Sequence, residues 1–210
     1  MESLEALQCL LQESAIPPGP GIAEQLKEYL ALLDKWNLRI NLTSSTDWRV
    51  IGPMFREAIW ASKFYPDWAV SHLDIGSGAG FPALLLKVLI PRIELEMVEG
   101  RVKKGHFLGT AAHAMGLSRV RVHTMPLSDY LGKCEGGRTW DCISWKALKL
   151  KTDDLLRLRE RTHPATQLWM FHGQFAALED GKSMEDCFQI IKNEKIPGRK
   201  DSYLSIYQPV

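Results

Sequence analysis

Residues 71–82 read Ser71-His72-Leu73-Asp74-Ile75-Gly76-Ser77-Gly78-Ala79-Gly80-Phe81-Pro82. We expect a strand before the first glycine and a helix after the last, because apolar runs lie on both sides of the glycines. Glycine permits unusual φ and ψ values and lets a ligand approach the backbone closely. In open parallel sheets, ligands bind beyond the carboxyl ends of the strands, where this loop lies. The segment therefore predicts an α/β fold with a ligand site at the loop.

Short apolar runs alternate with helical patterns along the rest of the chain. We predict strands over 70–75, 94–99, 119–123, 140–145 and 167–171, and helices over 80–90, 101–115, 126–131 and 152–161. Such alternation is typical of a parallel sheet with helices on both faces. The runs 187–192 and 203–207 have no helix between them and predict a closing antiparallel hairpin. The expected fold is Rossmann-like, with a mostly parallel sheet and a C-terminal hairpin.

The first 65 residues have a different pattern and predict a helical extension or cap, followed by a cofactor-binding domain over residues 66–210. Prolines and glycines break the chain over residues 16–21, because proline lacks the amide donor that a helix needs. Apolar residues then recur at helical spacing from Ile22 to Trp36. We expect Pro53 to limit where the next helix can begin.

The charges around the glycine loop indicate which ligand it binds. A dinucleotide site has the pattern G-x-G-x-x-G, whereas this loop reads G-x-G-x-G and follows Asp74. An acid would repel a pyrophosphate, but it suits the sulfonium and ammonium groups of S-adenosylmethionine (SAM). Glu99 ends the next predicted strand, where a carboxylate can accept hydrogen bonds from ribose hydroxyls. The alternative is a tight strand–helix turn beside a surface glutamate, which leaves the two acids unexplained.

The loop after the third predicted strand is expected to lie beside the adenine. Met125 and Leu127 would pack against the ring, although ordinary core packing is an equally good interpretation of these side chains. The predicted cofactor set is Asp74, Gly76, Ser77, Gly78, Gly80, Phe81, Glu99, Met125, Pro126, Leu127 and Lys146, with Phe81, Pro126 and Lys146 included on the resemblance described below.

Composition restricts the class of protein. The 210 residues carry a formal net charge of +1 and are 45% hydrophobic and 24% charged, which excludes a disordered chain. No apolar run approaches the ~20 residues that span a bilayer, and the acidic N-terminus lacks the basic region of a signal peptide. We expect a cytoplasmic monomer with no membrane partner. The cysteines and histidines lack the spacing of a zinc site, so we expect reduced thiols and no metal.

The near-neutral net charge hides an uneven distribution. Residues 1–34 are acidic, whereas residues 99–121 and 146–161 are basic. Lys103, Lys104 and Lys146 fall at the predicted carboxyl edge of the sheet, near the cofactor. A nucleic-acid partner is therefore compatible with the sequence, although such charge runs are also common on plain solvated surfaces.

The fourth predicted strand limits the methyl acceptor. The run Trp140-Asp141-Cys142-Ile143-Ser144-Trp145-Lys146 has neither the D/N/S-P-P-Y/F loop used for exocyclic amines nor a Pro-Cys pair. Cys142 lies inside the strand and is expected to be core. The acceptor should therefore already be a good nucleophile, such as guanine N7, whose lone pair needs no deprotonation. Catalysis would then rest on alignment with the sulfonium methyl.

The run Leu33-Asp34-Lys35-Trp36-Asn37-Leu38-Arg39-Ile40-Asn41-Leu42-Thr43, together with residues 73–82, resembles the RsmG/GidB family of bacterial small-subunit ribosomal RNA guanine-N7 methyltransferases. The resemblance covers roughly residues 22–208. It implies a class I methyltransferase fold with a helical cap, SAM as the methyl donor and 16S rRNA or a pre-ribosomal particle as partner. It also implies cofactor contacts at Gly76, Phe81, Pro126, Leu127 and Lys146, and active-site roles for Asn41, Lys103 and Lys146.

The sequence departs from the family at several basic positions. The R-H-x-x-D-S motif is replaced by residues 53–58, in which Glu57 keeps an acid. An arginine is absent near Met125, lysine replaces arginine at Lys146, histidine replaces lysine at His172, and Ser202 stands at the C-terminal arginine position. Two alternatives stay open: methylation of another RNA, a small molecule or a protein, and a non-catalytic SAM-binding module associated with the ribosome.

Overall fold

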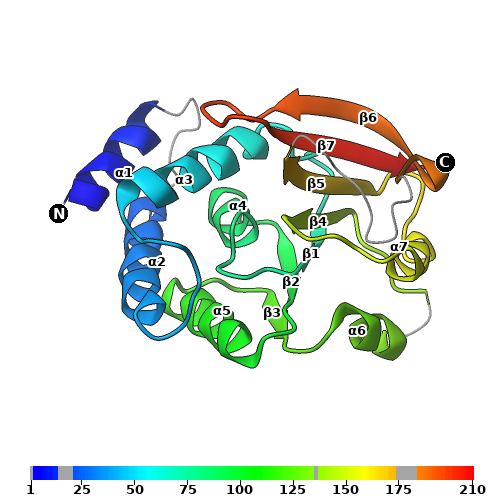
Figure 1. Cartoon of the computed structure of the whole chain (residues 1–210), viewed down its shortest axis with the longest axis horizontal. Helices are drawn as coiled ribbons and strands as arrows, with labels where there is room; N and C mark the ends of the chain where they lie inside the picture. The colour runs from blue at the N-terminus through cyan, green and yellow to red at the C-terminus, as the bar shows by residue number, and fades with distance from the viewer. Residues whose placement is uncertain (1, 14–20, 135–136, 174–183) are drawn as a thin grey trace.

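The computed structural model describes residues 2–13, 21–134, 137–173 and 184–210. Within this part of the chain, one seven-stranded sheet has the order β3-β2-β1-β4-β5-β7-β6 (Figure 1). The strands are β1 (Ser71–Ile75), β2 (Glu94–Val98), β3 (Val120–His123), β4 (Cys142–Lys146), β5 (Gln167–Gly173), β6 (Phe188–Lys195) and β7 (Ser202–Pro209). The first five strands are parallel, and β7 is antiparallel to both β5 and β6. The predicted sheet and its closing hairpin are confirmed.

Helices cover both faces of this sheet. They are α1 (Glu2–Glu13), α2 (Ile22–Asn37), α3 (Trp48–Ser62), α4 (Ala83–Leu89), α5 (Val102–Ala114), α6 (Leu127–Lys133) and α7 (Thr152–Arg159), with a 3₁₀ turn, η1 (Met184–Asp186). Helices α1–α5 pack on one face, while α6 and α7 pack on the other. Among the described residues, no helix is long and apolar enough to cross a membrane.

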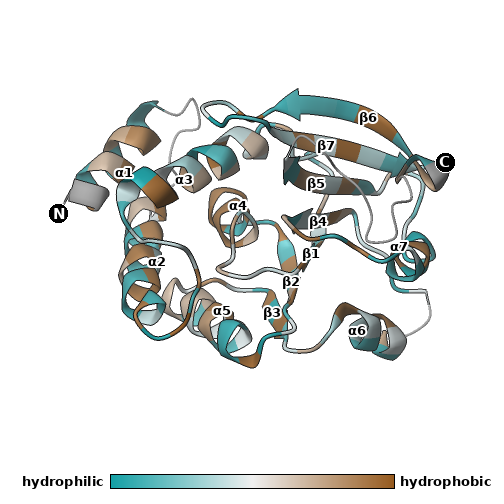
Figure 2. Ribbon diagram, in the orientation of Figure 1, coloured by the Kyte–Doolittle hydropathy of each residue, from teal (hydrophilic) through white to brown (hydrophobic). Residues whose placement is uncertain are grey.

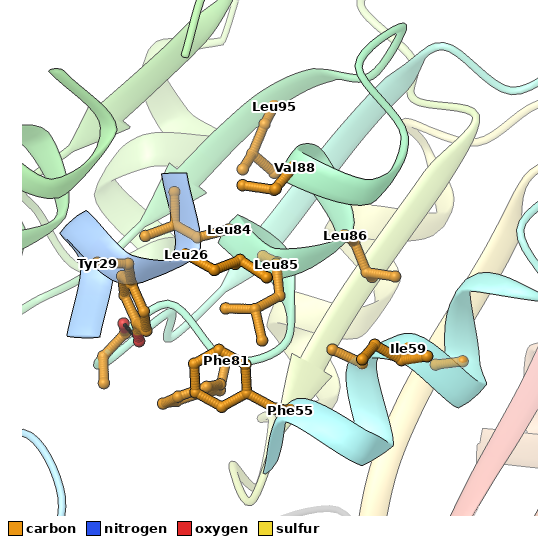
Figure 3. Close-up of a cluster of buried hydrophobic side chains, with 14 of the residues drawn as sticks. Leu26, Tyr29, Phe55, Ile59, Phe81, Leu84, Leu85, Leu86, Val88 and Leu95 are labelled. Carbon is orange, nitrogen blue, oxygen red and sulfur yellow. Dashed lines mark hydrogen bonds between the residues drawn. The ribbon is translucent and has the colours of Figure 1, made fainter. Parts of the chain in front are cut away.

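Two hydrophobic clusters follow from the alternation of side chains along the strands. In β2, Leu95 and Met97 face the α1–α5 layer, whereas Val98 faces α6 and α7. Figure 2 shows α4, which lies within the α1–α5 layer, mostly in the brown of hydrophobic residues. Figure 3 shows Tyr29 of α2 and Phe55 of α3 against residues of α4, so the first three helices share one core with the sheet. The domain boundary between residues 65 and 66 stays a prediction.

The start of α3 differs from the sequence expectation. The helix begins at Trp48, five residues before Pro53, so the expectation that Pro53 limits its beginning is wrong. The side chain of Asp47 caps the helix by accepting a hydrogen bond from the Arg49 amide at 2.8 Å. Buried residues such as Ile51 and Phe55 hold the same helix against the core despite the missing proline donor. Most of the predicted break, residues 16–20, lies outside the described residues.

Removing this cap gives a simple stability test. We expect Asp47→Ala to lower the free energy of unfolding by about 1 kcal/mol, because the Arg49 amide loses its acceptor. The midpoint of urea unfolding measures the change. Asp67→Ala is the matched control, since the ion pair of Asp67 with Arg92, at 3.9 Å, is exposed and contributes little. Equal midpoints for the two variants would contradict a capping role.

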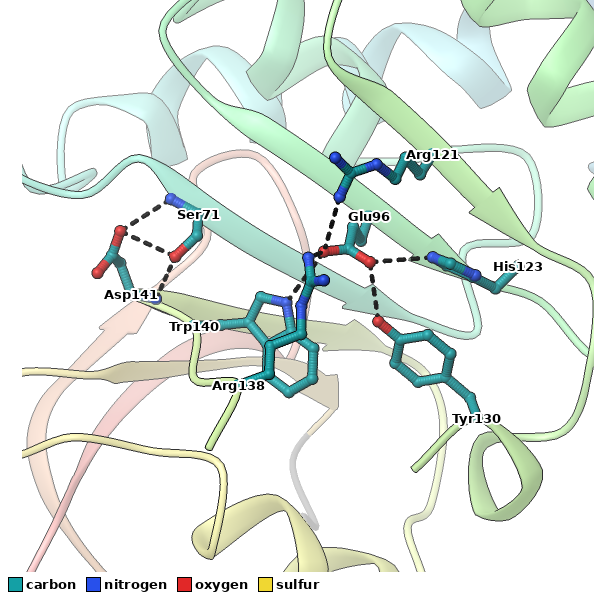
Figure 4. A network of polar contacts seen from close by, with 8 residues as sticks. All are labelled: Ser71, Glu96, Arg121, His123, Tyr130, Arg138, Trp140 and Asp141. Carbon is teal, nitrogen blue, oxygen red and sulfur yellow. Dashed lines mark hydrogen bonds and ion pairs between the residues drawn. The ribbon is translucent and has the colours of Figure 1, made fainter. Parts of the chain in front are cut away.

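A buried acid fixes the loop between β3 and α6. Glu96 of β2 lies 2.9 Å from His123 Nε2 and accepts a 2.9 Å hydrogen bond from the Tyr130 hydroxyl (Figure 4). Arg138 also pairs with this carboxylate. His123 ends β3 and Tyr130 belongs to α6, so Glu96 ties both ends of the intervening loop to the sheet. The loop holds Met125 and Pro126 at the carboxyl edge.

Candidate functional site

The glycine loop joins β1 to α4, and its glycines have separate roles. Gly76, Gly78 and Gly80 have φ values of 67°, 58° and 90°, a region that residues with side chains rarely adopt. A Cβ atom on Gly80 would lie 2.5 Å from Leu84 Cδ1, so this glycine allows the loop to pack on α4. A Cβ atom on Gly78 would meet nothing closer than the Gly76 carbonyl oxygen at 3.8 Å. The loop is therefore open above Gly78.

Glu99 lies at the end of β2 and binds this loop directly. Its Oε2 accepts a hydrogen bond from the Gly78 amide at 2.8 Å, and its Oε1 accepts one from the Arg101 amide at 2.8 Å. The residue is only 6% exposed, so the alternative of a surface glutamate is wrong. Each carboxylate oxygen keeps acceptor capacity for a further donor.

A cavity of about 560 Å³ opens beside Glu99, within the size range of small-molecule sites. Its walls come from the loops at the carboxyl ends of β1, β2, β3 and β4. The cavity brings together five of the residues predicted from the sequence: Gly76, Glu99, Met125, Pro126 and Leu127. This placement is compatible with the prediction that Met125 and Leu127 contact a ligand. Both side chains also pack against the hydrophobic cluster between the sheet and helices α6 and α7.

Asp74 lies one residue before this wall and is 2% exposed. Its Oδ1 accepts a 2.6 Å hydrogen bond from the Ser144 hydroxyl, whose oxygen lies 2.8 Å from His72 Nε2. Burial lowers the pKa of His72 to about 3, so this imidazole is neutral. Because the Ser144 hydroxyl donates to Asp74, its oxygen accepts from His72 Nε2. Burial also raises the pKa of Asp74 to about 6, although the Ser144 hydrogen bond acts in the opposite direction. The second oxygen, Oδ2, is buried and has no hydrogen-bond partner among the described residues.

Lys146 ends β4 and is held by a buried acid that the sequence did not connect with it. Its ammonium group pairs with Oε1 of Glu57, a residue of α3 that is 1% exposed. Arg199 Nε, from the β6–β7 turn, lies 3.0 Å from Oε2 of the same carboxylate; its N–H is not directed at that oxygen, so this is a charge contact. Burial lowers the pKa of Lys146, and the charge of Glu57 acts in the opposite direction.

Other predicted residues lie outside the cavity wall. Ser77 is buried in the loop, and its hydroxyl donates to the Asp74 carbonyl at 3.2 Å. The Phe81 ring packs edge-on against Tyr29 and Phe55 at 5.4 and 5.5 Å, which leaves its backbone for any ligand. Asn41 is exposed in the loop after α2. Lys103 is exposed on the first turn of α5, where it lines a different cavity.

Sequence reasoning missed two parts of the site. Residues 148–151, which follow β4, form another wall of the cavity, and only the basic character of this stretch pointed to it. Nothing in the sequence indicated that Arg199 contacts Glu57, because that approach depends on how the β6–β7 hairpin joins the edge of the sheet beside β5. Among the described residues, no group of His, Cys, Asp or Glu could hold a metal ion.

Solved structures with low sequence identity share this fold. A mutant of MtNAS in complex with S-adenosylmethionine aligns with a TM-score of 0.60 and 14% identity, over 90% of this chain and 73% of that one. A chain of the fibrillarin/Nop5p complex aligns with a TM-score of 0.58 and 15% identity, over 77% of this chain and 85% of that one. The fold is therefore that of class I SAM-dependent methyltransferases.

Sequence comparisons give the family. The family model GidB, described as rRNA small subunit methyltransferase G, matches residues 22–197. The ribosomal RNA small subunit methyltransferase G of Staphylococcus haemolyticus is 32% identical over 189 residues, which cover 89% of this chain and 75% of that protein. The protein of the same name from Streptococcus pneumoniae strain R6 is 31% identical over 155 residues, 69% of this chain and 62% of that protein. This chain belongs to the GidB family, the family of rRNA small subunit methyltransferase G.

Proposed function

We propose that this chain is a SAM-dependent methyltransferase that transfers a methyl group to N7 of a guanine in 16S ribosomal RNA. The observation that carries the proposal is the Glu99 carboxylate, fixed by two backbone amides at the wall of the cavity. A carboxylate at this place can accept hydrogen bonds from both ribose hydroxyls of a nucleoside. Membership of the GidB family supports the RNA acceptor.

The residues around the cavity fit SAM. Glu99 would hold the ribose, and the apolar side chains of Met125 and Leu127 would contact the adenine. Asp74 offers a buried oxygen without a partner among the described residues, which suits a cationic or hydrogen-bond-donating group. Gly78 leaves space above the loop for the amino-acid portion. When bound, SAM supplies a methyl group on a positively charged sulfur.

Guanine N7 needs alignment from the protein and no general base. Its lone pair forms the new N–C bond while the sulfur keeps the electrons of the broken S–C bond, and the ring acquires the positive charge. We propose that Asn41, Lys103 and Lys146 position the RNA around this reaction. Lys146 ends β4 beside the glycine loop and is the member of this set that is partly buried. Its charge stays balanced by Glu57 until the substrate arrives.

Mass spectrometry of methylated RNA tests the proposed function. Purified protein is incubated with isotope-labelled SAM and 16S rRNA, naked or in small subunits, from a strain that lacks its own enzyme of this family. We expect labelled 7-methylguanosine in the nucleoside digest. Label in another nucleoside, in transfer RNA or in protein would favour the alternative substrates, whereas SAM binding without any transfer would favour a non-catalytic module.

We also propose that the protein acts in the cytoplasm as a monomer. Light scattering of the purified protein tests the oligomeric state.

The raised pKa of Asp74 predicts that SAM affinity depends on pH. Because this pKa is about 6 in the free protein, the carboxylate is ionised above pH 6 and gains a proton as the pH falls below it. If the ionised form binds the cationic donor, the dissociation constant should rise up to about tenfold per pH unit below 6. Calorimetric titration between pH 5 and 8 measures this dependence.

Two variants isolate the contribution of Asp74. Asp74→Asn should bind SAM weakly at every pH, because the amide cannot ionise. Ser144→Ala removes a hydrogen bond that lowers the Asp74 pKa, so the affinity change should move to higher pH. A wild-type affinity that stays constant from pH 5 to 8 would contradict this role of Asp74.

A further inference from the structure

A second cavity, of about 490 Å³, lies between α2 and α5 and shares no lining residue with the cofactor cavity. Its half-buried lining includes Trp36 and Ile40, and exposed Lys35, Arg39, Lys103 and His106 also line it. We call this cavity the α2–α5 groove. None of the described residues that line it is acidic.

The groove begins at the carboxyl edge of the sheet. Gln25, near the start of α2, donates a 2.9 Å hydrogen bond to the carbonyl of Met115, just after α5, so the two helices are antiparallel. Figure 1 shows them side by side. The end of α2 therefore meets the start of α5, which follows Glu99 by only a few residues. A polymer that places one unit at the cofactor cavity can continue into the groove.

The charges that line the groove are available to a partner. Lys35, Arg39, Lys103 and His106 are all exposed, and none of them takes part in the ion pairs formed within the described part of the chain. The nearest acid along α2, Asp34, accepts a 2.6 Å hydrogen bond from the Thr46 hydroxyl. Lys35, Arg39 and Lys103 thus form a cluster of cations without an acidic partner in the described part of a nearly neutral chain, which favours an anionic partner.

Trp36 adds an aromatic surface between these cations. Its ring packs edge-on against Phe107 of α5, with centroids 5.8 Å apart and planes at 63°, so its orientation is fixed. The residue is half-buried and lines the groove with the part that stays exposed. Aromatic faces between basic side chains are the usual means of binding single-stranded nucleic acid, by stacking of bases and neutralisation of phosphates.

We propose that the α2–α5 groove binds a single-stranded segment of the substrate RNA next to the target guanine. Lys35, Arg39 and Lys103 would contact phosphates, and Trp36 would stack on a base. The inference rests on the proposed action on ribosomal RNA, and it adds a binding surface outside the cofactor cavity.

Direct RNA binding tests this surface separately from methyl transfer. Anisotropy of a fluorescent 16S rRNA fragment is measured without SAM for wild type, Lys35→Glu and the control Lys63→Glu. Both lysines are exposed and lie at or next to a helix C-terminus, and Lys63 belongs to the opposite edge of the sheet, ahead of β1. We expect Lys35→Glu to weaken RNA binding about tenfold and to reduce the slope of log affinity against log salt by about one.

The kinetic constants of the same variants should agree with their RNA affinities. Lys35→Glu should raise KM for RNA about tenfold while kcat and SAM affinity change less than about twofold, and Lys63→Glu should leave all three unchanged. Cross-linking of 4-thiouridine-labelled RNA should also yield peptides of α2 or α5. Wild-type RNA affinity in Lys35→Glu, with methylation intact, overturns the groove and leaves the proposed function standing. Wild-type protein that binds the RNA but modifies another nucleoside overturns only the guanine-N7 assignment.

Discussion

Gly78→Asp is expected to abolish SAM binding, with a dissociation constant raised at least about 100-fold, or about 2.7 kcal/mol. The new side chain would occupy the open space above the loop, and its carboxylate would lie near the place proposed for the SAM carboxylate. The φ value of 58° also disfavours any residue with a side chain. The Gly78 amide that fixes Glu99 would be displaced by any shift of the loop. Isothermal titration calorimetry measures the loss.

Two controls separate the causes of this loss. Gly116→Asp introduces the same side chain at a φ of 63° and in open space. It therefore measures the effect of backbone strain at a place away from the proposed cofactor site. Gly78→Asn fills the same volume without a charge and tolerates positive φ better than most residues. We expect SAM affinity to stay unchanged in Gly116→Asp and to fall less in Gly78→Asn than in Gly78→Asp. An unchanged affinity in Gly78→Asp would remove the cofactor from this loop.

The sequence was sufficient for the parts of the site that depend on local chain order. Glu99 could be located because a strand end and a glycine loop after a neighbouring strand must meet at one edge of a parallel sheet. The same rule placed Met125 and Leu127 in the cavity wall. In the register of β1 with β2, Asp74 pairs with Met97. The pairing of these two neighbouring strands is therefore enough to bring Glu99 beside the glycine loop.

The sequence was insufficient where packing determines a side chain's direction. The cofactor contact of Phe81 stays a prediction for its backbone; the sequence did not indicate that its ring packs in the core, against Tyr29 of α2 and Phe55 of α3. Lys103 was predicted at the carboxyl edge of the sheet; it lies there on the first turn of α5, and it lines the α2–α5 groove, a cavity that the sequence did not indicate. A one-residue change of position on a helix rotates a side chain by about 100°, and motif position alone does not resolve such a difference.

Glu57→Gln is expected to lower the free energy of unfolding by about 3 kcal/mol, because it removes the carboxylate that pairs with Lys146 and lies beside Arg199. Glu57 is 1% exposed, while the side chains of Lys146 and Arg199 are 22% and 24% exposed. The carboxylate joins α3, the end of β4 and the β6–β7 turn, so its loss affects the helical layer, the cofactor edge and the hairpin together. Glutamine keeps the shape, which confines the effect to charge.

The stability lost in Glu57→Gln should depend on pH, and the direction of this dependence can be checked. Burial already lowers the pKa of Lys146, and Glu57 opposes that shift. Without Glu57, the Lys146 pKa should fall further in the folded protein, while in the unfolded chain it keeps its ordinary value. The folded state then favours the neutral amine, so the deficit should shrink as the pH rises through the lowered pKa. Urea unfolding at pH 7 and pH 9.5 measures both values.

A double-mutant cycle with Lys146→Met isolates the ion pair from other effects of the substitution. The double variant should be more stable than the sum of the two single changes predicts, because no uncompensated ammonium group remains. In the double variant, Arg199 still lies beside a neutral amide, and this lowers the free energy of unfolding. Adding Arg199→Met should recover this loss in a triple variant. If Glu57→Gln loses less than about 1 kcal/mol at pH 7, this carboxylate contributes no more than an exposed pair, and the expected contribution of Glu57 to stability is wrong.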